Sequence, residues 1–141
     1  MADILYNLYL DESFHSRSDV YNFLSEVVCQ NSPLSKESIL QGFLDREAIG
    51  NIEIAEEVIL PHFEASQLTN QIIILRVKEA IKNWSSQIQS VRLIIAILAE
   101  ENSPSEEKKK IVNFVHKLAS DDFINQLLEA DKKNIFKIIE V

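Results

Sequence analysis

Short, nearly continuous runs of apolar and β-branched residues dominate the middle of this chain. They occupy residues 57–60, 71–77 and 91–98. A strand with solvent on one face alternates apolar and polar residues, whereas runs without alternation are typical of strands covered on both faces. We therefore expect a sheet between two layers of helices. A further strand is predicted over residues 4–10, where apolar residues do alternate with others.

A pair of helices is expected ahead of the apolar runs. Apolar residues at helical spacing predict a first helix over about residues 18–30, with Ser16 or Ser18 as its N-cap. Ser35 follows the turn and is a candidate cap for a second helix that ends near Gly50. The short turn between the two indicates a helix hairpin.

Three further helices are predicted after the last apolar run. Ser105 and Ser120 each precede acidic residues, which favour the first turn of a helix because the N–H dipoles point outward there. Asp131 is a candidate cap for a short final helix that extends to Ile138. Since the elements contain no internal repeat and no linker, residues 1–141 are expected to form one α/β domain.

Length and charge agree with this interpretation and exclude several functions. The 141 residues fit one domain, for which roughly 100 to 200 residues are usual. The 14 basic and 22 acidic residues give a net charge of −8, which repels a phosphate backbone and argues against nucleic-acid binding. A basic or neutral protein partner suits the chain better.

The sequence carries no sign of export or membrane insertion. Its opening residues lack a basic segment, so neither a signal peptide nor a transit peptide is predicted. No apolar run reaches the roughly 20 residues that span a bilayer. Cys29 is the only cysteine and cannot form an intrachain disulfide. We expect a protein of the reducing cytoplasm.

The three histidines are the candidates for chemistry near neutral pH. None has a spacing typical of zinc ligands, and glycine-rich loops and a serine elbow are missing, so no metal or cofactor is expected. His15 and His116 fit surface positions. His62 follows Pro61, and because proline ends a strand ladder, His62 is predicted to be displayed off the sheet, as a nucleophile would be. An ordinary polar residue at a strand end is the alternative.

Residues 46–62, which read REAIGNIEIAEEVILPH, resemble the active-site stretch of the enzyme IIA domains of the bacterial sugar phosphotransferase system, fructose/mannitol type. Arg46, Glu47, Pro61 and His62 match the Arg-Glu pair and the Pro-His of that family without a gap. The continuation PHFEAS is similar to the galactitol-like branch, and the likeness extends over nearly the whole chain. It implies a central mixed β-sheet with helices packed on both faces.

The resemblance also implies a function and its residues. In such domains the Pro-His histidine accepts a phosphoryl group from the histidine phosphocarrier protein and passes it to a Cys or His of enzyme IIB. This role falls to His62, and Arg46 is the matched candidate for a guanidinium clamp on the transferred group. The implied partners are these two proteins, with no cofactor, no direct nucleic-acid contact and no membrane insertion.

The chain departs from the family pattern at several positions. Ile52 stands where the family has threonine, and Ala55 and Glu57 stand where it has glycine. Bulk and negative charge near the phosphoryl group are expected to weaken phosphate binding. The second active-site histidine of the mannitol branch falls near Lys108, which either supplies a charge in its place or faces solvent.

Two functions from different classes follow from the resemblance. The first is a phosphohistidine carrier for sugar uptake. The second is a diverged enzyme IIA-like regulatory module, as found in transcription activators and antiterminators. The sequence leaves both open.

Overall fold

The computed structural model describes residues 5–139, which form helices and strands in the predicted α/β order. The elements are β1 (Leu5–Glu12), α1 (Arg17–Cys29), α2 (Lys36–Ile49), β2 (Glu53–Ala55), β3 (Val58–Ile59), β4 (His62–Ala65), β5 (Gln71–Lys82), β6 (Ser90–Glu100), α3 (Ser105–Lys117), α4 (Asp121–Glu129) and α5 (Lys132–Ile139). Strands β2 and β4 were not predicted, because they are short and partly polar. Ile4, the first residue of the predicted opening strand, lies outside the described residues.

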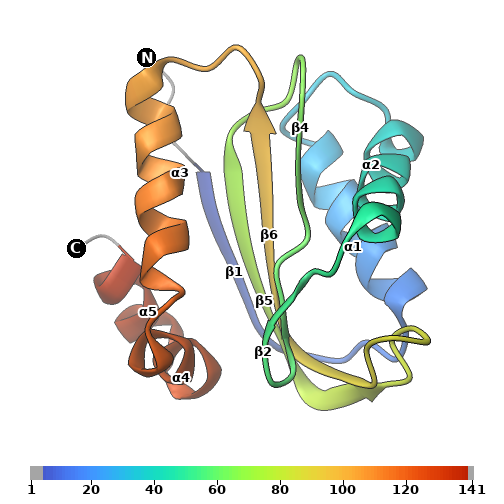
Figure 1. The fold of residues 1–141 in the computed structure, drawn as a ribbon, viewed down its shortest axis with the longest axis vertical. Coiled ribbons are helices and arrows are strands. Elements are labelled where there is room, and N and C mark those ends of the chain that lie inside the picture. The colour runs from blue at the N-terminus through green and yellow to red at the C-terminus, as the bar shows by residue number, and fades with distance from the viewer. Residues whose placement is uncertain (1–4, 140–141) are drawn as a thin grey trace.

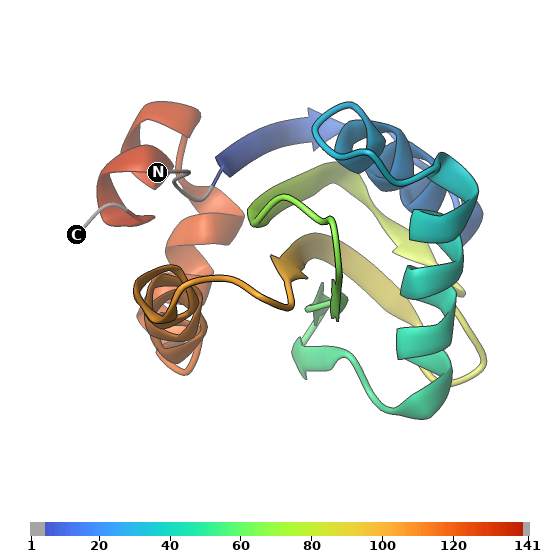
Figure 2. The ribbon, with the colours of Figure 1, turned by 90° about the horizontal axis from the view of Figure 1, so that it is seen from above.

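The strands form one mixed sheet, as expected. Its order within the described residues is β1-β5-β6-β3-β2, and β4 pairs with β6 beyond the end of β3. The two long strands β5 and β6 are antiparallel, whereas β1 runs parallel to β5, and β3 and β4 run parallel to β6. Helices α1 and α2 cover one face, and α3, α4 and α5 cover the other (Figures 1 and 2).

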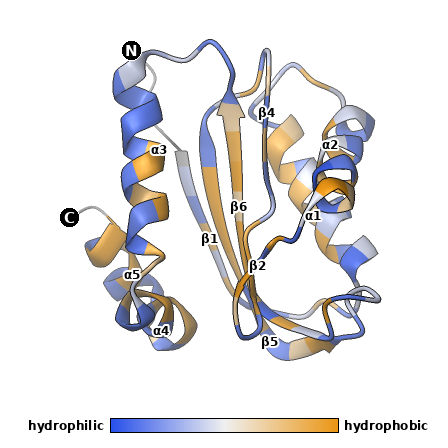
Figure 3. Cartoon of the chain, viewed as in Figure 1, coloured by the Kyte–Doolittle hydropathy of each residue, from blue (hydrophilic) through white to orange (hydrophobic). Residues whose placement is uncertain are grey.

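The two helical layers explain the continuous apolar runs. Ile73 and Leu75 of β5 pack into the core beneath α1 and α2, while Ile72 and Ile74 pack into the core beneath α3, α4 and α5. All four side chains are fully buried. Figure 3 shows the apolar residues concentrated on the sheet and on the helix sides that face it. None of the helices within residues 5–139 has the length and apolar character needed to cross a bilayer.

The helix starts follow their capping residues with one exception. The hydroxyl groups of Ser16, Ser35 and Ser120 accept backbone N–H groups at the starts of α1, α2 and α4, as predicted. Asp131 accepts the N–H of Asn134 in the same way. Helix α3 begins at Ser105, as predicted, but its cap position is taken by the residue before it, Pro104, which offers no side-chain acceptor.

Pro61 interrupts the sheet edge without ending it, which corrects the prediction that the ladder stops there. Its carbonyl accepts the N–H of Ile97 in β6, but its ring nitrogen has no proton to donate. Pairing with β6 resumes at once, and His62 lies opposite Ile97 as the first residue of β4. His62 is therefore held in a strand at the sheet edge, close to a rigid joint.

Candidate functional site

His62 presents an exposed imidazole whose orientation is fixed at one nitrogen. Its Nδ1 atom lies 3.0 Å from the carbonyl oxygen of Leu60. A carbonyl oxygen only accepts hydrogen bonds, so in this arrangement Nδ1 carries the proton and the neutral ring keeps its lone pair on Nε2. No residue within 5–139 hydrogen-bonds to Nε2. The geometry leaves one nucleophilic nitrogen available.

The imidazole lines a cavity of about 260 Å³ between the sheet and α3. Ile97 and Ala99 of β6 form one side of the cavity, and Ile111 and Val112 of α3 form another. Lys108, in the first turns of α3, also lines it, and its Nζ atom donates to the carbonyl of Glu101 at 3.1 Å. A cation and the histidine therefore share one cavity.

Arg46 lies on the other side of β4. It belongs to the last turn of α2, and its Nη1 atom donates to the Gly50 carbonyl at 3.1 Å. It lines a second groove, of about 620 Å³, between α2 and β4, whose lining includes Phe63 but not His62. The cause is strand alternation: Phe63 faces α2, so its neighbour His62 faces the α3 side. The structure does not bring Arg46 and His62 into one cavity.

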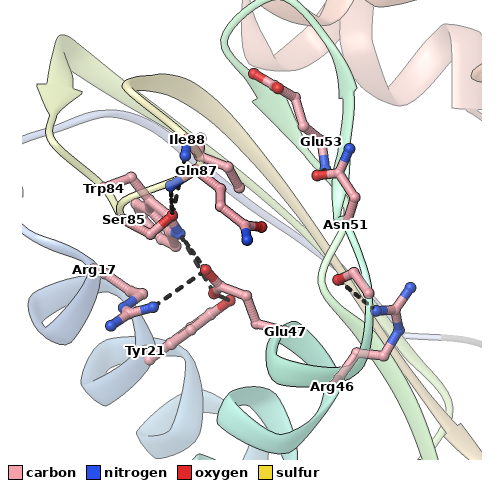
Figure 4. A network of polar contacts seen from close by, with 11 residues as sticks. Arg17, Tyr21, Arg46, Glu47, Asn51, Glu53, Trp84, Ser85, Gln87 and Ile88 are labelled. Atoms are coloured by element: carbon pink, nitrogen blue, oxygen red, sulfur yellow. Dashed lines mark hydrogen bonds and ion pairs between the residues drawn. The ribbon is translucent and has the colours of Figure 1, made fainter.

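Glu47 points away from Arg46 into a buried polar network (Figure 4). Its carboxylate accepts the Tyr21 hydroxyl at 2.6 Å, the indole N–H of Trp84 at 3.2 Å and the Arg17 guanidinium at 3.3 Å. Burial and the hydrogen bond to Glu47 raise the pKa of Tyr21 well above its usual value. Glu47 thus ties the end of α2 to α1 and to the connection between β5 and β6. No local sequence pattern indicates this network, because its members lie far apart in the chain.

The hairpin between β2 and β3 lies away from His62. This corrects the expectation that Ala55 and Glu57 bring bulk and negative charge near the phosphoryl group. The carbonyl of Glu57 accepts the N–H of Arg92 at 2.8 Å, whereas His62 pairs with Ile97. From Arg92 to Ile97 the strand advances about 16 Å. Direct contact between residue 57 and a group on His62 is therefore excluded.

The same hairpin explains why glycine suits position 57. Glu57 has φ of 62°, a left-handed conformation that glycine adopts without steric cost. Its carboxylate accepts a hydrogen bond from the Ser90 hydroxyl, and this contact links the turn to the start of β6. The Glu57 side chain therefore anchors the hairpin to β6, at a distance from the imidazole.

The remaining candidates stay outside this region. His15 is exposed in the loop before α1, and His116 is exposed in the last turn of α3. Cys29 is half-buried, and its Sγ atom donates to the Glu26 carbonyl. Within residues 5–139, no three His, Cys, Asp or Glu side chains gather as metal ligands.

Comparison with known proteins decides the family. The profile described as phosphoenolpyruvate-dependent sugar phosphotransferase system, EIIA 2, matches residues 6–141. The chain belongs to this family. Membership of the EIIA 2 family confirms the resemblance seen around Arg46 to His62, and it associates the chain with phosphoryl transfer in sugar transport. A search of curated proteins returned no match.

Solved structures confirm the EIIA fold. Nitrogen regulatory protein IIA-Ntr from Neisseria meningitidis superposes with a TM-score of 0.77 at 18% identity, over 95% of this chain and 92% of that one. Mannitol IIA from Escherichia coli gives 0.68 at 18% identity, over 94% and 95% of the two chains. The complex of Escherichia coli IIAMtl with phosphorylated IIBMtl gives 0.62 at 16% identity, over 96% and 99%.

Proposed function

We propose that this EIIA chain is a phosphohistidine carrier that accepts a phosphoryl group on Nε2 of His62. The histidine phosphocarrier protein would be the donor, and an enzyme IIB would be the acceptor, in sugar uptake. The observation that carries the proposal is the exposed imidazole with Nδ1 held by the Leu60 carbonyl and Nε2 without a partner in the described chain.

The imidazole has the properties that a nucleophile needs. The lone pair on Nε2 attacks phosphorus and forms an N–P bond, while the bond from phosphorus to the donor nitrogen breaks and its electron pair stays on the donor. Positive charge then spreads over the His62 ring, where the Leu60 carbonyl stabilises the Nδ1–H. The same steps in the opposite direction deliver the group to an acceptor.

Lys108 carries a positive charge and lines the same cavity as His62. One of its three ammonium protons is directed to the Glu101 carbonyl, which leaves two for phosphoryl oxygens. Such a charge would offset the roughly −2 charge of the group on the ring. Lys108 therefore takes the electrostatic role in this proposal.

Arg46, unlike Lys108, does not line the His62 cavity and would have to move to reach the phosphoryl group. It follows Gly42 by one helical turn on the same face of α2, and Gly42 packs directly on Phe63 of β4. Because α2 and β4 run in opposite directions (Figure 1), this turn lies toward the His62 end of β4. A clamp by Arg46 requires its guanidinium to leave the Gly50 carbonyl and reach past the sheet edge.

The acceptor assignment draws on a structural relative. One superposing structure is a complex of IIAMtl with phosphorylated IIBMtl. It supports an enzyme IIB as the partner of this chain. The alternative, a regulatory module in a transcription activator or antiterminator, would take up phosphate without passing it to an enzyme IIB.

The test is phosphorylation in a reconstituted system. Purified protein is incubated with phosphoenolpyruvate, enzyme I and the histidine phosphocarrier protein, and intact mass is measured before and after acid treatment. We expect one acid-labile phosphate on the wild type and on His116→Ala, a matched exposed histidine, and none on His62→Ala. If the wild type gains none, or if His62→Ala gains as much, the proposal is wrong.

A second step separates the two functions. Phosphorylated protein is mixed with purified enzyme IIB proteins, and loss of the phosphate from His62 is followed with time. Transfer supports the carrier. A stable phosphoprotein that leaves the enzyme IIB unphosphorylated supports the regulatory module.

A further inference from the structure

One carboxylate shares the His62 cavity. Glu64 lies two residues after His62, on the same side of β4, about 7 Å away along the strand. Both side chains are exposed and line the same cavity beside α3. Glu64 also lines the groove between β4 and α2, so it lies on the rim between the two hollows.

Glu64 has no partner of its own. No hydrogen bond or ion pair joins its carboxylate to any residue within 5–139. Lys108 is the one lysine or arginine that lines the cavity in the described part of the chain. A phosphoryl group on His62 would therefore have one cation and one unpaired anion as charged neighbours.

The edge of the sheet next to Glu64 is open to a partner. The carbonyls of Pro61 and Ala65 accept N–H groups from β6, so these residues direct their backbone toward β6. The backbone groups of His62 and Glu64 alternate with them and point to the edge of β4 that pairs with no strand within residues 5–139. Ile49 and Val112, exposed by 82% and 49%, lie on the two hollows that flank this strand.

We propose that Glu64 is a specificity-determining residue for phosphoryl transfer, which selects protein partners that place a Lys or Arg side chain beside the phosphoryl group. The inference rests on the proposed phosphorylation of His62. A partner cation would pair with Glu64 and also offset the charge of the group in transit. A donor without a cation gains no such pairing, and the carboxylate of Glu64 repels its phosphoryl group.

The test compares two donors of opposite character. The histidine phosphocarrier protein is the protein donor, and phosphoramidate is a small anionic donor without any cationic side chain. Initial rates of His62 phosphorylation are measured for the wild type, Glu64→Gln, Glu64→Asp and Glu53→Gln. Glu53, on the edge strand β2, is an exposed glutamate outside the cavity and serves as the matched control.

Only transfer from the protein donor should become slower when Glu64 loses its charge. Glu64→Gln should slow transfer from the protein donor about threefold, flatten its dependence on ionic strength, and leave the rate with phosphoramidate equal or higher. Glu64→Asp should recover the protein-donor rate, and Glu53→Gln should match the wild type. Glu64→Gln slowing both donors equally, or accelerating both, would overturn the inference alone. A wild type that takes no phosphate from the protein donor would overturn the proposed function as well.

Discussion

Glu47 and His62 are two polar residues of the same motif with opposite surroundings. The Glu47 carboxylate is only 11% exposed and accepts hydrogen bonds from three side chains. His62 is exposed and has one fixed contact, at Nδ1. A polar side chain that makes all its hydrogen bonds within its own chain stabilises the fold. An exposed side chain with a nitrogen left without a hydrogen bond is available for chemistry. Variants at Glu47 are therefore expected to change stability, and variants beside His62 are expected to change phosphoryl transfer.

The largest effect on stability is expected at Glu47. Glu47→Ala removes the acceptor of Tyr21, Trp84 and Arg17 and leaves buried donors unpaired, so the free energy of unfolding should fall by about 3 kcal/mol. Urea unfolding measures it. Glu37→Ala, at an exposed position of the same helix, should change it by less than about 0.5 kcal/mol. If the two variants lost equal free energy of unfolding, the network around Glu47 would contribute no more to stability than an exposed side chain does.

Removing one donor should have a smaller effect. Tyr21→Phe keeps the packing against Phe43 but loses the 2.6 Å bond to Glu47, at a cost of about 2 kcal/mol because the acceptor is charged. Tyr9→Phe, at a half-buried tyrosine on the same side of the sheet, is the control and should be nearly neutral. A Tyr21→Phe protein as stable as the wild type would contradict the network's role.

The same tyrosine gives a pH dependence with a defined sign. The folded protein holds the pKa of Tyr21 above that of the unfolded chain, through burial and the bond to Glu47. The stabilisation is therefore complete below about pH 10 and is lost as pH rises further, because the unfolded chain releases the proton first. The stability advantage of the wild type over Tyr21→Phe should narrow in urea titrations above that pH. A constant advantage would contradict the shift.

The smallest effect is expected in the cavity beside His62, where a variant should change the transfer rate and leave stability unchanged. Lys108→Gln should slow phosphorylation of His62 about fivefold, the upper range for an exposed charge pair, with no measurable change in urea unfolding. Lys109→Gln, at the neighbouring exposed lysine that does not line the cavity, is the control. If the two variants behave alike, Lys108 faces solvent without a function in transfer.

The sequence predicted those parts of the fold that local patterns determine. The unbroken apolar runs at 71–77 and 91–98 required cover on both faces, and the structure places one core on each side of β5 and β6. Capping by Ser16, Ser35 and Ser120 was also readable, since each cap bonds within its own first turn. Such signals depend on neighbours a few residues apart.

The errors arose where distant segments meet. Pro61 was expected to end the ladder, but β6 continues past it and pairs with β4. The motif contains both Arg46 and His62, yet in the structure they line different cavities, because His62 faces α3 whereas Arg46 lies on α2. The network around Glu47 joins residues up to 37 positions apart. No window of sequence contains these contacts, so only the structure supplies them.

In the proposed carrier, the Leu60 carbonyl fixes the proton on Nδ1 of His62 and leaves Nε2 to take the phosphoryl group. Phosphorylated protein labelled with ¹⁵N at histidine tests it directly, through the coupling between phosphorus and nitrogen in NMR spectra. We expect phosphorus bonded to Nε2 of His62, with Nδ1 still protonated. Phosphorus on Nδ1, or on another residue, would contradict it.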